Sequence, residues 1–129
     1  MSGGLERYLL VALGGAVGSC ARYALGGWVS ARTGGTFPWG TLIVNVTGCF
    51  VIGVFLTAAV DRLVLDPRWR LLVAVGFCGG YTTFSTLAFE TSKLLDARSV
   101  AFATLNVAGS FVAGIVAVRL GSAIAERMW

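Results

Sequence analysis

The chain has 129 residues, of which 57% are hydrophobic and 12% are charged, and its formal net charge is +4. A soluble domain usually carries roughly 25% charged residues, so this composition excludes an ordinary soluble globule and indicates a membrane protein. The Lys and Arg residues are scattered, which leaves no basic block to follow a nucleic-acid backbone. The chain has no His, the commonest general base and metal ligand.

Four apolar stretches follow one another along the chain. Residues 8–21 give only 14 uncharged positions, whereas residues 33–60, 71–89 and 99–118 give 28, 19 and 20. A helix needs ~20 residues to cross the hydrocarbon core, so the first helix must continue through Arg22. We therefore expect an all-α integral membrane protein, one domain over 1–129, with spans at about 5–29, 39–60, 69–95 and 99–125.

The residues between the spans agree with this division. Pro38 and Pro67 stand where a first-turn proline is tolerated. Tryptophans, which often anchor helices at the interface, fall near the expected span ends at Trp28, Trp39, Trp69 and Trp129.

The basic residues give only a weak signal for orientation. On the N-terminal side of the membrane lie Arg7, Arg62, Arg68, Arg70, Arg119 and Arg127. On the other side lie Arg22, Arg32, Lys93 and Arg98. The positive-inside rule weakly favours a cytoplasmic N-terminus, but insertion in both orientations, as in an antiparallel dimer, stays open.

Polar side chains within the spans are functional candidates because they are costly in a membrane. Arg22 either reaches back to the interface or acts at a pore mouth. Asn45 either bonds a neighbouring helix or offers its N–H groups to an acceptor. Glu90 either pairs with Lys93 or ends a polar stripe.

Two further polar sets share helix faces. Thr83 and Thr86 are spaced to lie on one face with Glu90, and Asn106 and Ser110 are four residues apart. Both sets can also be simple helix–helix hydrogen bonds.

The third span contains the least helical sequence. The run GFCGGYTTFST at residues 76–86 joins a Gly-Gly pair to two β-branched threonines, which are poor helix formers. We predict a broken helix near the middle of the bilayer. Such breaks occur where protein or water satisfies the freed carbonyls, and they often bind ions.

Three motifs resemble those of the Fluc fluoride channels, also called CrcB proteins. The run GGYTTFST at 79–86 resembles their GGxTTFSTF signature, and PWGTLIVN at 38–45 resembles their PxGTLxVN motif. GGAVG at 14–18, followed by Arg22, is similar to GGxxGxxxR. The resemblance covers the whole chain.

The resemblance implies a passive channel that exports fluoride across the inner membrane to relieve its toxicity. It further implies an antiparallel, dual-topology homodimer with two pores, and a sodium ion held by the backbone carbonyls of Gly79 and Thr82. The pore residues that it implies are Arg22, Thr41, Asn45, Phe84, Thr86, Leu87, Glu90, Asn106 and Ser110. Leu87 is a departure, because the family has a second phenylalanine there.

Other classes of function are less consistent with the sequence. A small four-helix drug/proton antiporter needs a carboxylate inside the first span, but Glu6 lies outside that apolar run. A purely structural subunit does not explain Asn45 together with the hydroxyls of 82–86. An enzyme is not expected, because no nucleophile–base pair is visible. The three cysteines lack metal-site spacing and are interpreted as small apolar residues.

Overall fold

The computed structural model describes residues 2–129, which form helices and contain no strand. The helices are α1 (Ser2–Thr33), α2 (Trp39–Leu56), η1 (Thr57–Arg62), α3 (Pro67–Trp69), η2 (Arg70–Cys78), α4 (Gly79–Tyr81), α5 (Phe84–Asp96) and α6 (Val100–Met128). η1 and η2 are wider π-helical turns that continue α2 and α3.

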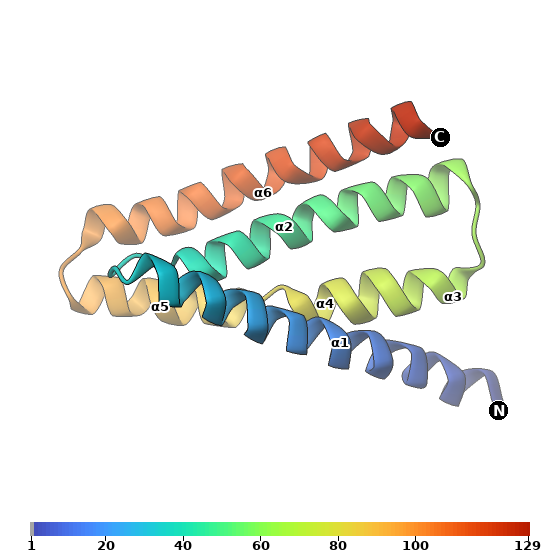
Figure 1. Cartoon of the computed structure of the whole chain (residues 1–129), viewed down its shortest axis with the longest axis horizontal. Helices are drawn as coiled ribbons and strands as arrows, with labels where there is room; N and C mark the ends of the chain where they lie inside the picture. The colour runs from blue at the N-terminus through green and yellow to red at the C-terminus, as the bar shows by residue number, and fades with distance from the viewer. Residues whose placement is uncertain (1) are drawn as a thin grey trace.

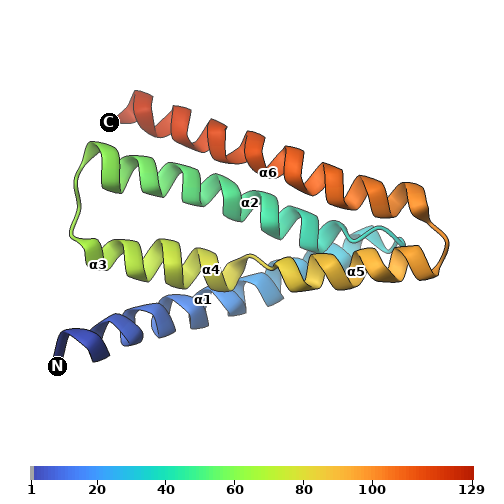
Figure 2. The ribbon, with the colours of Figure 1, turned by 180° about the vertical axis from the view of Figure 1, so that it is seen from behind.

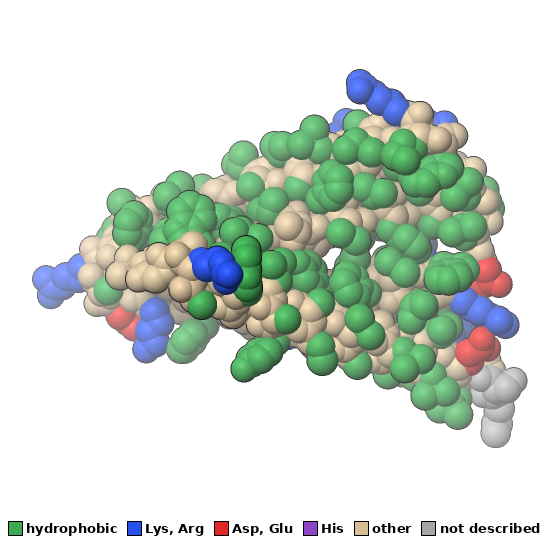
Figure 3. Space-filling model, in the orientation of Figure 1, with side chains coloured by type: hydrophobic (Ala, Val, Ile, Leu, Met, Phe, Trp, Pro, Cys, Tyr) green, Lys and Arg blue, Asp and Glu red, His purple; other side chains and the backbone are tan. Residues whose placement is uncertain are grey.

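These helices make four segments long and apolar enough to cross a membrane, as predicted. They cover Gly3–Thr33, Trp39–Arg62, Pro67–Asp96 and Val100–Met128, slightly more than the sequence indicated. Both termini lie at the same end of the molecule, as an even number of crossings requires (Figure 1). Charged side chains gather toward the two ends, while apolar side chains cover the length between them (Figure 3).

The second and third spans begin at the two prolines of the chain. Pro38 precedes α2, and its carbonyl accepts a hydrogen bond from Leu42 N at 3.2 Å. Pro67 is the first residue of α3, and the Asp66 side chain caps that helix by accepting from Arg68 N at 2.9 Å. Both prolines therefore occupy positions where a missing backbone N–H costs nothing.

Small residues let the helices approach closely. A Cβ atom on Gly18 would collide with the carbonyl oxygen of Phe77, and one on Gly80 would lie 2.6 Å from the carbonyl oxygen of Gly15. α1 therefore packs backbone to backbone against η2 and α4, the kind of contact that small-xxx-small patterns allow. α2 packs most extensively against α6, and α1 crosses the bundle obliquely (Figure 1).

Candidate functional site

The third span is interrupted, as the sequence predicted, and the interruption lies between α4 and α5 (Figure 2). Thr82 and Thr83 are extended, with φ/ψ of −88°/155° and −147°/115°. Gly79 and Gly80 themselves are helical. The helix therefore ends at the β-branched threonines and not at the Gly-Gly pair, because extended backbone is the conformation that β-branched residues favour.

The two threonines end one half-helix and begin the next. Thr82 donates from both its backbone N and its Oγ1 to the carbonyl of Cys78, at 3.0 and 2.9 Å. Thr83 Oγ1 accepts from Thr86 N at 3.2 Å and so caps α5. Thr83 thus lies outside the helix that carries Thr86 and Glu90, contrary to the expectation of a shared helical face.

Asn45 of α2 holds the interrupted backbone. Its Nδ2 donates to the Thr83 carbonyl at 3.1 Å, and its Oδ1 accepts from Thr83 N at 2.8 Å. One amide thereby satisfies both backbone polar groups of a residue that has no helical partners. Asn45 therefore bonds the backbone of the third span, and one of the two N–H donors of its amide is already used.

Arg22 of α1 contacts the break from another side. Its Nε donates to the Gly80 carbonyl at 3.1 Å, and Ser19 Oγ also donates to that carbonyl at 3.5 Å. α1 continues to Thr33, so Arg22 lies about three turns before the helix end. Its position supports a structural or electrostatic role over reaching to the interface.

A polar cavity of about 230 Å³ lies between α1, α2 and α5. Its lining includes Arg22, Thr41, Thr83, Thr86 and Glu90. Thr41 Oγ1 donates to Glu90 Oε1 at 2.8 Å, and Glu90 Oε2 is buried without a partner among the described residues. Arg22, Thr41, Thr86 and Glu90, which the resemblance implied as pore residues, therefore lie around one cavity, and their role in a pore stays a prediction.

Glu90 does not pair with Lys93. Within residues 2–129 the one ion pair joins Arg68 to Glu6 at 3.1 Å, near one end of the bundle. Lys93 Nζ instead lies 5.4 Å from the centre of the Phe89 ring. Glu90 therefore belongs to the polar cavity and not to a surface charge pair.

A second cavity, of about 330 Å³, lies between α2, α5 and α6 and is mainly apolar. It is lined by Asn45, Cys49, Leu87, Ser110, Phe111, Gly114, Ile115, Val118 and Arg119. Ser110 Oγ is buried and has no hydrogen-bond partner in the described part of the chain. Ser110 therefore presents a free hydroxyl at this cavity. Arg119, the one charged residue of the lining, was not singled out from the sequence as a site residue.

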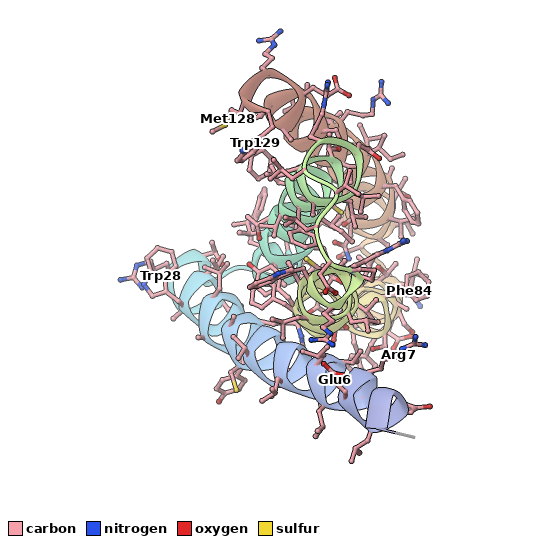
Figure 4. The ribbon with its side chains drawn as sticks, turned by 90° about the vertical axis from the view of Figure 1, so that its right-hand side faces the viewer. Glu6, Arg7, Trp28, Phe84, Met128 and Trp129 are labelled. Atoms are coloured by element: carbon pink, nitrogen blue, oxygen red, sulfur yellow. The ribbon has the colours of Figure 1, made fainter. Side chains whose placement is uncertain are left out.

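A third cavity, of about 340 Å³, lies directly against the break. Its lining includes Asn45, Gly79, Thr82, Phe84 and Leu87. Phe84 is 74% exposed, whereas Leu87 is 7% exposed. Phe84 projects from the side of the bundle away from Trp28 (Figure 4), so its ring is free to meet something outside this chain.

Asn106 lies apart from the cavities and is fully buried. Thr91 Oγ1 donates its proton to the Leu87 carbonyl at 2.7 Å, so it must accept from Asn106 Nδ2, which lies 3.0 Å away. This fixes the amide orientation and leaves Asn106 Oδ1 without a partner among residues 2–129. Asn106 therefore donates to α5 as a helix–helix hydrogen bond. Thr91 was not singled out from the sequence, where nothing marks it.

Taken together, the fold and these polar groups define a multi-pass membrane protein with an interrupted third span. A family model described as "CrcB-like protein, Camphor Resistance (CrcB)" matches residues 9–122, and the chain belongs to this family. It is similar to three proteins named "Fluoride-specific ion channel FluC". The one from Acidobacterium capsulatum is 46% identical, with 95% of this chain and 98% of that protein covered. The one from Solibacter usitatus is 47% identical, with 94% and 99% covered. The one from Thermus thermophilus is 49% identical, with 92% of each covered.

Proposed function

We propose that this chain forms a passive, fluoride-selective channel that releases fluoride from the cytoplasm and so relieves its toxicity. The observation that carries the proposal is its membership of a family whose similar proteins are named fluoride-specific channels. Its four spans make it a multi-pass membrane protein, in bacteria one of the plasma membrane, and its family is one of ion channels and not of enzymes.

The free hydrogen-bond donors support an anion path. Ser110 Oγ makes no hydrogen bond in the described residues, and Thr86 Oγ1 accepts from Thr83 while its own proton has no acceptor. Asn45 keeps one N–H. Fluoride is small and accepts hydrogen bonds strongly, so a narrow path with such donors replaces its water and disfavours larger halides.

Pairing with a second, antiparallel copy is part of the proposal. The exposed Phe84 ring and the cavity beside it lie on one side of the chain, where a second subunit would complete a pore. The positive edge of the ring would then face the anion. The weak charge asymmetry is consistent with insertion in both orientations.

A sodium ion at the break is a further part of the proposal. The carbonyls of Gly79 and Thr82 accept no hydrogen bond from the described residues, so oxygen ligands suited to a hard cation are free. Two carbonyls are fewer than a bound cation needs, and a second subunit would supply the remainder. The ion would then link the two subunits by binding carbonyl oxygens of both.

An efflux assay tests the proposed channel. Liposomes containing the purified protein and loaded with fluoride or chloride are diluted into halide-free buffer, and efflux is followed with ion-selective electrodes. We expect rapid fluoride efflux, slow chloride efflux, and neither from protein-free liposomes. Equal efflux of both halides would refute selectivity, and flux that requires an imposed proton or drug gradient would indicate an antiporter. The Glu6–Arg68 pair near the end of the bundle gives such an antiporter no support.

A further inference from the structure

The backbone carbonyls of the break divide into two groups. The Cys78 carbonyl accepts a hydrogen bond from Thr82. The Gly80 carbonyl accepts from Arg22 and Ser19, and the Thr83 carbonyl accepts from Asn45. The carbonyls of Gly79, Tyr81 and Thr82 accept none from residues 2–129. The same short segment therefore contains both free and held carbonyls, and those of Gly79 and Thr82 each stand directly before a held one.

Asn45 and Arg22, on two different helices, bond the held carbonyls next to Gly79 and Thr82. Asn45, on α2, pairs with both the N–H and the C=O of Thr83, so it fixes the residue that follows Thr82 and precedes Phe84. Arg22, on α1, holds the Gly80 carbonyl, which follows Gly79. Each free carbonyl of the proposed cation site is therefore next in sequence to a carbonyl that one of these two side chains holds.

An asparagine is suited to this contact for a chemical reason. Its planar amide carries an acceptor oxygen and a donor nitrogen on the same carbon, and these match the N–H and the C=O of one peptide residue. An aspartate only accepts, and an apolar side chain does neither. Unpaired backbone groups are costly inside a membrane, so the contact favours one conformation of the break.

We propose that Asn45 and Arg22 are positioning residues for the break: they engage the carbonyls of Thr83 and Gly80 and thereby leave those of Gly79 and Thr82 aligned for a cation. This rests on the proposed function in taking the cation to be sodium. In the alternative, Asn45 serves only as a donor to fluoride. The two readings differ in whether changing Asn45 alters cation binding when no fluoride is present.

The test measures thermal unfolding of the purified full chain against sodium concentration, in fluoride-free buffer with choline replacing sodium at constant ionic strength. The wild type is compared with Asn45→Leu, which is close in size and uncharged, and with Arg22→Lys. Ser122→Ala is the matched control, because it removes a hydroxyl of α6 that bonds the Gly53 carbonyl of α2 and does not contact the break.

We expect sodium to stabilise the wild type and Ser122→Ala with the same half-saturating concentration. In Asn45→Leu and Arg22→Lys that concentration should rise at least tenfold. Arg22→Lys keeps the charge, so it decides the question if Asn45→Leu does not fold. The proposal would be overturned by an unchanged half-saturating concentration in Asn45→Leu and Arg22→Lys, by an equal shift in Ser122→Ala, or by no sodium effect in the wild type. Because no fluoride is present, these results are independent of whether the wild type conducts fluoride.

Discussion

Replacing Phe84 with leucine should lower fluoride flux with little effect on folding. The ring is 74% exposed, so few packing contacts are lost, and the free energy of unfolding should change by less than about 0.5 kcal/mol. A charge meeting the favourable part of an aromatic ring gains about 1–2 kcal/mol, by analogy with cation–π pairs. Loss of that contact in the rate-determining step lowers flux roughly 5- to 30-fold.

Leu87 provides the matched comparison. It is 7% exposed and lines the cavities on both sides of it, so it shapes their wall without a polar role. Leu87→Phe should preserve or raise flux, because the neighbouring cavities offer room for a ring. Leu87→Ala should instead destabilise the protein by about 2–5 kcal/mol, as for other buried leucines.

The flux of these variants is measured as fluoride efflux from liposomes, normalised to the amount of folded protein recovered. Their stability is measured by thermal unfolding in detergent. Wild-type flux in Phe84→Leu would refute the role of the ring edge. Block of flux by Leu87→Phe would show that the second position restricts the path sterically in this chain.

Three other changes test the packing and the topology. Gly18→Val should lower the free energy of unfolding by about 1–3 kcal/mol or more, because a backbone carbonyl of the third span occupies the space that the new side chain needs. Gly27 has open space around it, so Gly27→Ala should be nearly neutral in the same unfolding assay. Thr91→Val should lower the free energy of unfolding by about 0.6 kcal/mol. In a double-mutant cycle, adding Asn106→Leu to Thr91→Val should remove no further hydrogen bond. Additive losses of stability would show that the two residues do not interact. Lysines added to the loop at 33–38 should force one orientation and reduce flux, as measured by side-specific labelling and efflux; full activity from a singly oriented protein would exclude the antiparallel dimer.

The four spans were predictable because hydropathy and span length are local properties of the chain. Stretches of 28, 19 and 20 uncharged residues need no knowledge of neighbours to be assigned. The first span was harder, since Arg22 interrupts it, and only the continuous helix to Thr33 shows how far it extends. The break was also predictable from the poor helix formers within residues 76–86, and the structure places it at Thr82 and Thr83.

The partners of the polar residues were not predictable from their own segments. Asn45 contacts a residue 38 positions away, and Arg22 contacts one 58 positions away. The sequence marked both as costly in a membrane and left open what they bond. Residues such as Thr91 and Ser19 carried no signal, because a hydroxyl in an apolar helix most often bonds its own backbone.

By itself, then, the amino-acid sequence determined that this chain is a four-span membrane protein with an interrupted third helix. It did so because apolar length and helix propensity act within a single segment. Only the tertiary structure decided that Asn45 and Arg22 engage the broken backbone and that Thr41 meets Glu90. Those contacts depend on how closely glycine-lined helices approach and at what angle they cross, which is a property of the packed bundle.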